Sequence, residues 1–260
     1  MTTIFTVPKP FSGHIGMIQM NAIGSWCSLV PRCQVVLCGQ EPGIAEVAAH
    51  FGVDHMPDVA TNDYGTPLLD SVFAGVAGIA RFDTMCYLNS DVMVLQNLLS
   101  ALAGIDFEQY LMVGGRWDLA LDTAWDFCDP SWGELLETRI AADARRHPPM
   151  GSDFFAFPRL SPLTTLPQFA VGRPGWDNWM IARARSLHIP VVDSSDVVTV
   201  VHQDHDYAHV PGSRLGIWEG PEADANRRLM GDSPVMVLAD ADWEMTSSGL
   251  VERSIQAGAP

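Results

Sequence analysis

The stretch that decides the fold is Thr84-Met-Cys-Tyr-Leu-Asn-Ser-Asp-Val-Met-Val94. Its first five residues are mostly apolar, which is typical of a strand that is buried on both faces of a parallel sheet. Asn89-Ser90-Asp91 comes next and is followed by a second apolar run. A carboxylate directly after such a strand lies at the carboxyl edge of the sheet, where open α/β folds bind their ligands. The stretch therefore predicts a ligand-binding position at Asp91.

Short apolar runs alternate with amphipathic segments on both sides of this stretch. The runs that predict strands are 3–7, 34–38, 53–56, 110–113, 154–157 and 197–201. The segments with helical spacing of apolar residues are 13–26, 42–51, 66–81, 95–102, 132–146 and 176–187. Thr66 and Pro67 suit a helix start, and Pro148-Pro149 suits a helix end. The alternation predicts an α/β fold whose parallel sheet is covered by helices on both faces.

The composition narrows the class of partner. The chain has 260 residues, of which 47% are hydrophobic, enough for a substantial core in one large domain. Fifteen Lys and Arg residues face 31 Asp and Glu residues, which gives a formal net charge of -16. This charge repels nucleic acids and anionic membrane surfaces, so we expect neither as a partner. A nucleotide diphosphate is also anionic, and a divalent cation would be needed to offset the repulsion.

The sequence also predicts a compartment. Pro8, Lys9 and Pro10 interrupt the region where a signal peptide would carry its apolar segment. No stretch approaches the roughly 18 apolar residues of a transmembrane helix. The five cysteines are scattered, odd in number and without zinc-type spacing, as in proteins with reduced thiols. We therefore expect a cytoplasmic protein with no transmembrane segment.

A second cluster of polar residues follows the predicted strand 197–201. The sequence Val198-Thr-Val-Val-His-Gln-Asp-His-Asp-Tyr-Ala-His209 contains three His and two Asp residues within eight positions. Mg²⁺ and Mn²⁺ prefer carboxylate and phosphate oxygens, and Mn²⁺ also accepts imidazole. His202 is favoured as a ligand over His205 and His209 because it lies directly at the strand end. A structural role for these imidazoles remains the alternative.

A third candidate is Gly172-Arg-Pro-Gly-Trp-Asp-Asn-Trp179. Gly and Pro place Asp177 at the start of a helix, where it could be a catalytic carboxylate or simply an N-cap. Trp176 could offer a stacking face to a sugar, or could equally belong to the core.

The order of these elements resembles the nucleotide-sugar glycosyltransferases of the GT-A fold over roughly residues 3–210. The resemblance rests on Asn89-Ser90-Asp91, Gly175-Trp-Asp-Asn178 and His202, with Asn89 standing where the family's Asp-x-Asp motif has its first acid. It implies a Rossmann-like three-layer α/β/α fold with a mixed, mostly parallel central sheet. It also implies one domain over residues 1–260, with a nucleotide-binding half (1–105), an acceptor and metal half (106–215) and a C-terminal extension (216–260).

The resemblance further implies a metal-dependent transfer of a sugar from a UDP- or GDP-sugar to a hydroxyl of a carbohydrate or other acceptor. Asp91 and His202 would hold Mn²⁺ or Mg²⁺, and Asp177 would be the general base of an inverting enzyme, whereas a retaining enzyme needs no such base. The residues implied to bind the nucleotide sugar are Thr6, Val7, Pro8, Asp63, Thr66, Asn89, Ser90 and Asp91. Those implied to meet the acceptor or the sugar are Gly115, Arg116, Trp117, Asp153, Trp176 and Asn178.

Two other functions remain open. A sugar-phosphate nucleotidyltransferase shares the sheet and the metal, although the N-terminal Gly-rich signature of that class is missing and only Lys9 is present. A non-catalytic metal- or sugar-binding protein would use the His-Asp cluster as a plain metal site. The motifs Gly-x-Gly-x-x-Gly after the first strand, Gly-x-x-x-x-Gly-Lys-Ser/Thr and Gly-x-Ser-x-Gly are absent, so the sequence supports neither a dinucleotide-binding fold, nor a P-loop NTPase, nor an α/β-hydrolase.

Overall fold

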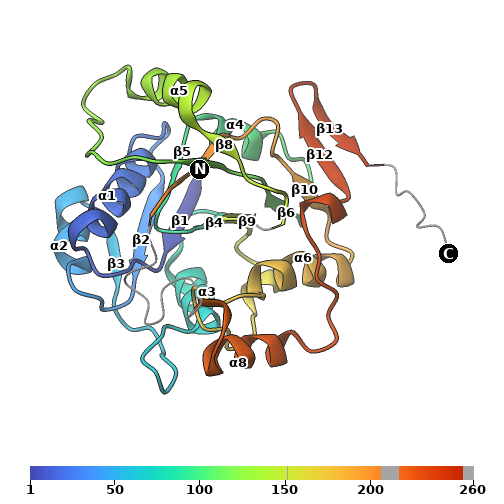
Figure 1. Cartoon of the computed structure of the whole chain (residues 1–260). Helices are drawn as coiled ribbons and strands as arrows, with labels where there is room; N and C mark the ends of the chain where they lie inside the picture. Colours follow the sequence, from blue (N-terminus) through green and yellow to red (C-terminus); the bar gives the residue numbers. More distant parts are fainter. Residues whose placement is uncertain (151, 206–216, 254–260) are drawn as a thin grey trace.

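The computed structural model describes residues 1–150, 152–205 and 217–253. Its helices are α1 (Gly13–Cys27), α2 (Ile44–Phe51), α3 (Leu69–Ile79), α4 (Asn97–Ala103), α5 (Trp132–Asp143), α6 (Trp176–Ser186) and α8 (Pro221–Met230). Two 3₁₀ turns are η1 (Pro162–Thr164) and η2 (Leu238–Asp240). Figure 1 shows their arrangement around the sheet.

Nine strands form the main sheet, in the order β13-β12-β10-β6-β9-β4-β1-β2-β3. In chain order these are β1 (Thr2–Thr6), β2 (Gln34–Cys38), β3 (Asp54–Met56), β4 (Thr84–Leu88), β6 (Leu111–Val113), β9 (Phe154–Pro158), β10 (Val191–Asp193), β12 (Trp243–Thr246) and β13 (Gly249–Glu252). Strands β3, β2, β1 and β4 run parallel, as do β6, β10 and β12. Only β9 and the edge strand β13 run against their neighbours. The prediction of an α/β fold with a mixed, mostly parallel central sheet is confirmed.

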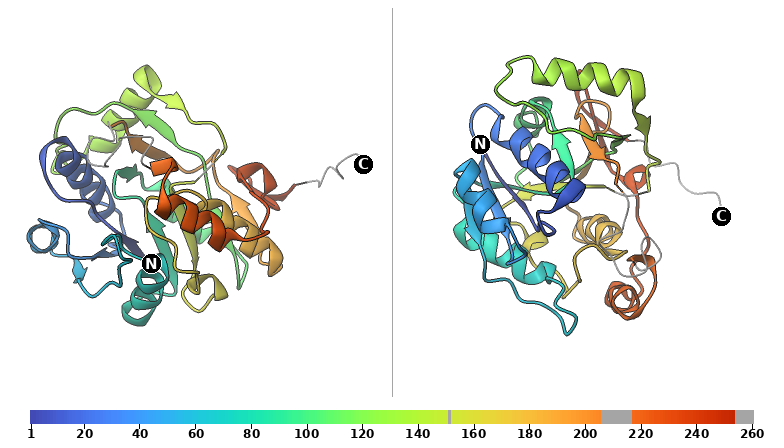
Figure 2. Two further views of the ribbon diagram at one scale, coloured as in Figure 1. Left: turned by 60° about the horizontal axis from the view of Figure 1, so that its bottom comes forward. Right: turned by 60° about the vertical axis from the view of Figure 1, so that its left-hand side comes forward.

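Helices cover both faces of this sheet, as the alternation of elements predicts. Phe5 and Tyr87 point to one face and pack with α3 and α6, while Ile4 and Cys86 point to the other and pack with α1, α2 and α4. This opposite orientation of neighbouring residues follows from the two-residue period of a strand. The views in Figure 2 show the resulting layers. Because helices cover both faces, polar side chains that need solvent or a ligand gather beyond the ends of the strands.

A smaller sheet has the order β5-β11-β7-β8. Its strands are β5 (Val92–Val94), β7 (Trp117–Leu119), β8 (Arg145–Arg146) and β11 (Val200–Gln203). Strand β5 follows β4 after a short turn, so this turn joins the two sheets. Strand β11 pairs antiparallel with β5 and parallel with β7, which brings His202 opposite Val92 and Asp118.

Three sequence-based predictions of local structure are wrong in detail. The helix predicted at 132–146 ends at Asp143, because Arg145 and Arg146 pair with β7 as a short strand. The helix predicted from Thr66 begins at Leu69, because the preceding residues make isolated bridges, Thr61 to Pro67 and Leu68 to Ala170. The strand predicted at 197–201 runs from Val200 to Gln203, so His202 lies within it rather than after it.

The residues beyond 216 contribute to the main sheet, since β12 and β13 form one of its edges. Among the helices that the structure describes, none is both long enough and apolar enough to cross a membrane. All five cysteines are free thiols.

Candidate functional site

A cleft of about 410 Å³ lies where β1 and β4 end and β11 approaches them. Several segments of the chain meet there, among them the turn after β1, the residues before α3, the turn between β4 and β5, the residues before β7, those before β9, the end of β11, and the turn before α6. Parallel strands bring their carboxyl ends to one edge of a sheet, which explains why segments so distant in sequence converge. The residues that line the cleft include Val7, Pro8, Lys9, Tyr64, Thr66, Asn89, Asp91, Arg116, Asp153, Arg173, His202 and His205.

Asp91 lines the cleft although it is only 5% exposed. Its Oδ2 accepts a hydrogen bond from Lys9 Nζ at 3.0 Å and lies 3.2 Å from His205 Nε2. Its Oδ1 is buried and has no hydrogen-bond partner among the described residues. A buried carboxylate oxygen without a partner is costly, because it has lost water without gaining a replacement. The position suits a ligand that supplies positive charge.

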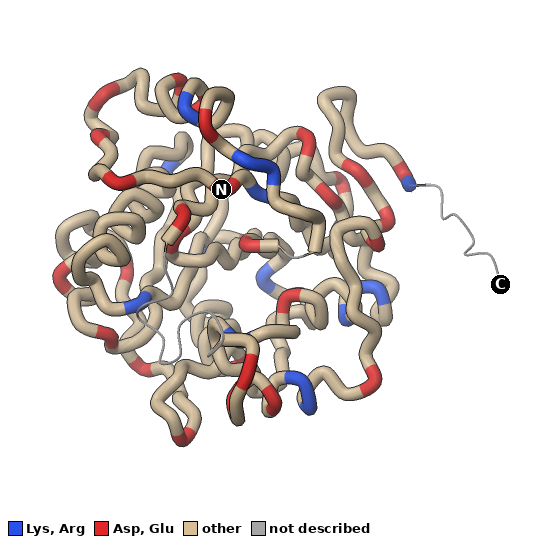
Figure 3. Tube along the Cα trace, in the orientation of Figure 1, with Lys and Arg blue, Asp and Glu red and all other residues tan. Residues whose placement is uncertain are grey.

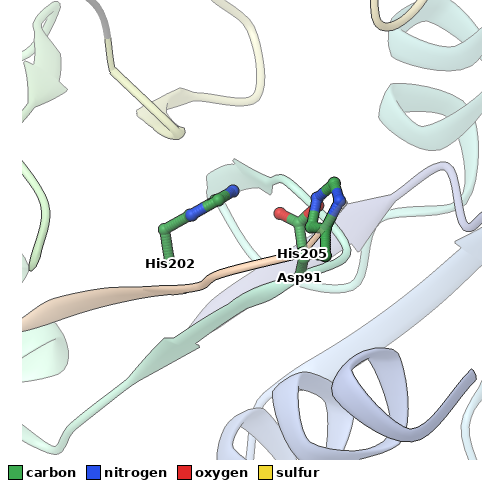
Figure 4. A group of neighbouring side chains, drawn as sticks. All are labelled: Asp91, His202 and His205. Atoms are coloured by element: carbon green, nitrogen blue, oxygen red, sulfur yellow. The ribbon is translucent and has the colours of Figure 1, made fainter. Parts of the chain in front are cut away.

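His202 lies in β11, the strand that pairs with β5, and His205 lies two residues beyond the end of β11. Both side chains are close to Asp91. One ligand atom from each of the three side chains can be chosen so that all lie within 4.8 Å of one another. Figure 4 shows His202 pointing toward the pair formed by Asp91 and His205. One carboxylate and two imidazoles within this distance form a donor set that fits a divalent cation such as Mn²⁺.

Gln203 fixes the position of this segment relative to Asp91. Its backbone N–H and its side-chain Nε2 both donate to the Asp91 carbonyl oxygen, at 3.2 and 3.1 Å. Its Oε1 accepts a hydrogen bond from Asn21 Nδ2 at 3.0 Å, which ties it to α1. Gln203 is fully buried, so the link between the turn at Asp91 and β11 is shielded from water. The two imidazoles are therefore held near Asp91 by backbone pairing as well as by their own contacts.

The charge state of Asp91 follows from these neighbours. Burial alone would raise the pKa of the carboxyl group. The positive charge of Lys9, the hydrogen bond with His205 and the nearby His202 instead hold the pKa well below its ordinary value of 3.8. Asp91 is thus an anion at neutral pH, as a metal ligand has to be.

A second network borders the cleft around Arg116. Its Nη1 donates to Asp153 Oδ2 at 2.6 Å, and its Nε donates to Asp118 Oδ1 at 2.9 Å. Asn89 Nδ2 donates to the other oxygen of Asp153 at 2.7 Å. Each carboxylate oxygen of Asp153 therefore accepts a hydrogen bond, and the Asn89 amide helps to hold Asp153 in place.

His202 also faces acids on its other side. Its Nδ1 lies 3.6 Å from Asp118 Oδ1 and 4.0 Å from Asp204 Oδ1. Both distances exceed those of hydrogen bonds, and Nδ1 is buried with no such partner among the described residues. The other oxygen of Asp118, Oδ2, forms a hydrogen bond of 2.8 Å with His147 Nδ1. Carboxylates on the far side of an imidazole often orient a metal-binding histidine, and Asp118 is near enough to do so after a small movement.

Asp177 lies in the first turn of α6 and does not line the cleft. Burial raises the pKa of its carboxyl group above the ordinary value of 3.8, backbone N–H groups at the helix start lower it in part, and the negative charge of Asp153 raises it further. Asp177 is therefore close enough to Asp153 for the two charges to interact. General bases share this raised pKa, and so do acids that are simply buried.

The structure divides the other sequence-predicted site residues into two groups. Val7, Pro8, Thr66, Asn89, Arg116 and Asp153 line the cleft together with Asp91 and His202. Thr6 and Ser90 are buried, Asp63 is exposed, and none of the three lines the cleft. His209 lies outside the described residues.

The remaining predicted residues are engaged elsewhere. Trp176 packs edge-on against Phe73 and Tyr87 in the core and presents no stacking face to the cleft. Asn178 donates to two backbone carbonyl oxygens. The guanidinium of Arg146 covers the ring of Trp117 at 5.0 Å. The backbone N–H of Gly115 donates to Ser195 Oγ at 2.7 Å.

One wall of the cleft is held by Glu222 at the start of α8. Its Oε1 accepts a hydrogen bond from Asn62 Nδ2 at 2.7 Å, and its Oε2 accepts one from Arg173 Nη2 at 2.7 Å. Asn62 Oδ1 in turn accepts the backbone N–H groups of Tyr64 and Thr66, which shapes the turn before α3. Sequence reasoning missed Glu222, since nothing in a charged helical stretch marks the one residue that reaches a distant turn.

We expect Glu222→Gln to lower the free energy of unfolding by roughly 1–2 kcal/mol near pH 7, because charge-assisted hydrogen bonds are lost. Burial alone would raise the pKa of Glu222, but hydrogen bonds from Thr66, Asn62 and Arg173 hold it below its ordinary value of 4.5. The ionised carboxylate therefore stabilises the fold above about pH 4.5, and this contribution disappears as the pH falls through the lowered pKa. Urea unfolding of both proteins at about pH 7 and pH 3.5 measures the effect. An equal difference at both pH values would contradict it.

Sequence reasoning also underrated Lys9 and His205. The signal for Lys9 was present, because it is the only lysine of the chain. Acidic positions are spread along much of the chain trace, whereas basic positions occur in a few short segments (Figure 3). Three of the basic residues, Lys9, Arg116 and Arg173, line the cleft. Three acids, Glu41, Asp91 and Asp153, also line it, so basic and acidic residues balance in the cleft of a protein that is strongly negative as a whole.

No model of a known protein family matches the chain, and no curated protein matches it. Similar solved structures include Staphylococcus aureus TarS 1–349 in complex with UDP-GlcNAc, at 14% identity and a TM-score of 0.36, over 46% of this chain and 35% of that one. The matched region is thus about a third of the length of that TarS structure.

Two further structures cover more of the chain. A protein from Desulfovibrio desulfuricans G20 described as a nucleotide-diphospho-sugar transferase has 11% identity and a TM-score of 0.45, over 88% of this chain and 96% of that one. The mannosyltransferase PcManGT from Pyrobaculum calidifontis, in complex with GDP-Man and Mn²⁺, has 10% identity and a TM-score of 0.46, over 77% and 56%. With TM-scores below 0.5, these matches carry no conclusion about the activity of this chain. The solved structures that this chain matches do include nucleotide-sugar glycosyltransferases, the class that its sequence resembles.

Proposed function

We propose that this chain is a metal-dependent glycosyltransferase that moves a sugar from a UDP- or GDP-sugar to a hydroxyl of a carbohydrate or other acceptor. The observation that carries the proposal is the cluster of Asp91, His202 and His205, which offer one ligand atom each within 4.8 Å of one another, in a cleft that Lys9 also lines. A divalent cation that is bound by one carboxylate keeps a net positive charge. It can therefore bind the anionic diphosphate of the donor.

The donor set fits the proposed metal. Asp91 Oδ1 is buried without a hydrogen-bond partner among the described residues, so it has a lone pair to give. Imidazole nitrogens beside a carboxylate favour Mn²⁺ over Mg²⁺, which prefers an all-oxygen shell. We propose Asp91 and His202 as ligands, with His205 as a further candidate. When bound, the cation would supply positive charge that stabilises the departing diphosphate.

The donor is proposed to lie across the ends of β1 and β4. Val7, Pro8, Thr66 and Asn89 line this part of the cleft, and Thr6 and Ser90 lie directly beside them in sequence. The turn after β1 offers backbone groups to the base and ribose. Asp63, which is exposed next to the lining residues Tyr64 to Thr66, is proposed to reach the ribose or the donor sugar.

The acceptor is proposed to approach from the side of Asp153 and Asp177. Asp177 would take the proton of the acceptor hydroxyl while its oxygen attacks the anomeric carbon and the bond to the diphosphate breaks, with inversion. Arg116 holds Asp153 as an ion pair at 2.6 Å, so Asp153 is better suited to hydrogen-bond a sugar hydroxyl than to accept a proton. Gly115 and Trp117, which flank Arg116 in sequence, and Trp176 and Asn178, which flank Asp177, complete the proposed acceptor region.

One observation favours a second candidate, a sugar-phosphate nucleotidyltransferase. Lys9 reaches into the cleft from the turn after β1. A lysine there would stabilise a departing pyrophosphate when a sugar phosphate attacks a nucleoside triphosphate. Release of pyrophosphate from UTP or GTP in the presence of a hexose 1-phosphate would identify that reaction.

A thermal-shift panel of nucleotide sugars, with and without Mn²⁺, tests the proposal. A ligand at about 100 times its Kd is expected to raise the melting temperature by roughly 5–10 °C. We expect this rise for a UDP- or GDP-sugar only when Mn²⁺ is present. Slow hydrolysis of the same donor without acceptor would mark a transferase rather than a binding protein. No shift with any member of the panel would refute the proposal.

We also propose a cytoplasmic location and a single catalytic unit over residues 1–260. Free thiols at all five cysteines suit a reducing compartment. Strands from the first half, the second half and the region beyond 216 share one sheet, which suits one cooperative unit.

A further inference from the structure

Lys9 is the only lysine among the 15 basic residues of this chain, and the proposed reaction gives it no role. Its Nζ donates to Asp91 Oδ2 at 3.0 Å, and its side chain is 30% exposed. The ammonium group therefore contacts a buried acid of the cleft and is itself partly exposed. Any anion entering the cleft next to Asp91 meets this group.

The side chain of Gln19 holds the backbone of Lys9 in place through two hydrogen bonds. Gln19 Oε1 accepts the Lys9 backbone N–H at 2.7 Å, and Gln19 Nε2 donates to the Lys9 carbonyl oxygen at 2.9 Å. Gln19 is fully buried in α1. Pro8 and Pro10 flank Lys9 and restrict the chain on both sides. The start of the lysine side chain is thus fixed, and only its flexible stem can move.

The two other basic side chains of the cleft are differently engaged. Arg116 makes ion pairs with Asp118 and Asp153, and Arg173 makes one with Glu222 through two nitrogens. Asp91 is the single ion-pair partner of Lys9 among the described residues. An ammonium group has three donors, so contact with Asp91 leaves capacity for further acceptors.

We propose that Lys9 has two states: without ligand it neutralises Asp91, and with ligand it binds the diphosphate of a nucleotide beside Asp91. This inference rests on the proposed function and deepens it by naming a diphosphate-binding residue. In the first state the ammonium and a divalent cation compete for the same carboxylate. In the second state both positive charges face the same anion. Lys9 therefore opposes binding of the metal alone and favours binding of the metal with the nucleotide.

This gives two expected effects of opposite sign for Lys9→Met, which keeps the length of the side chain and removes its charge. Mn²⁺ alone is expected to bind roughly 10-fold more tightly, because a positive charge close to Asp91 is gone. UDP or GDP in the presence of saturating Mn²⁺ is expected to bind roughly 10-fold to 100-fold more weakly, because a charge-assisted contact is lost. Lys9→Arg should restore much of the nucleotide affinity. Isothermal titration with Mn²⁺, UDP, GDP and inorganic pyrophosphate measures all of these.

Arg81→Met is the matched control. Arg81 makes an ion pair with Asp54 at 2.8 Å but does not line the cleft, so its loss should change neither affinity. Failure of the wild-type protein to bind Mn²⁺ and any of the three phosphate compounds would overturn the proposed function. Wild-type binding with no difference between Lys9→Met and Arg81→Met would overturn the role of Lys9 alone. Equal weakening of Mn²⁺ and nucleotide binding in Lys9→Met, with a lower melting temperature, would also overturn it and assign a structural role.

The single lysine permits a second, independent measurement on the wild-type chain. Reductive methylation with ¹³C-formaldehyde keeps the charge of the amine and labels only Lys9 and the α-amino group of Met1. We expect UDP with Mg²⁺, which is diamagnetic and does not broaden the signals as Mn²⁺ would, to shift the Lys9 methyl signal and to leave the Met1 signal unchanged. A Lys9 signal that stays fixed while titration shows UDP bound would contradict the proposal.

Discussion

Asp91→Asn is expected to weaken Mn²⁺ binding by on the order of 1,000-fold, since even indirect partners of a metal ligand contribute roughly 10–100-fold. Metal-dependent binding of a nucleotide sugar should fall with it. The amide keeps the shape of the side chain and removes the only carboxylate from the group that contains His202 and His205. Titration of Mn²⁺ and of the nucleotide sugar, with circular dichroism to verify folding, measures the loss.

Asp54→Asn is the control for this variant. Asp54 also accepts an ion pair at 2.8 Å, from Arg81, and it lies outside the cleft. It should retain the metal and nucleotide affinities of the wild-type chain. Full Mn²⁺ affinity in Asp91→Asn would show that the cation, if it binds, binds elsewhere, and the proposed site would be wrong.

Asp177→Asn is expected to lower kcat by roughly 10²–10⁴-fold with little change in KM, which is the usual contribution of a general base. The carboxylate must be ionised to accept a proton, so activity exists above its pKa and is lost as the pH falls through it. Because burial raises the pKa of Asp177 above 3.8, this loss should begin at a higher pH than for an ordinary aspartate. A transfer assay over a range of pH values measures both effects.

The melting temperature of Asp177→Asn shows whether a loss of activity comes from the missing base or from a destabilised fold. An aspartate whose pKa is raised in the folded protein is less stable as an anion there, so Asn at this position should leave the melting temperature equal or higher near pH 7. Asp224→Asn, an exposed acid on α8 that pairs with Arg227 at 2.8 Å, is the control and should keep full activity. Unchanged kcat in Asp177→Asn would exclude it as the base and would favour a retaining mechanism.

Asp91 and His202 are predicted as site residues because each is expected at or near the end of a buried strand. The structure places Asp91 just after β4 and His202 within β11. The apolar runs that locate such strands are visible because strands buried on both faces need continuous apolar sequence. Trp176 shows the limit of the same reasoning. An aromatic residue at a helix start reads alike whether it faces a ligand or packs against Phe73 and Tyr87.

By itself the sequence determined the class of fold, the mostly parallel sheet and the acid at its edge, because these follow from local periodicity and from the residues that end strands. Only the tertiary structure decided which distant side chains meet. Gln203 ties β11 to the Asp91 carbonyl, Lys9 reaches Asp91 from the first turn, and Glu222 joins two walls of the cleft. Such contacts join residues far apart in the chain, and their partners are selected by packing and charge in three dimensions, which leaves no local pattern to read.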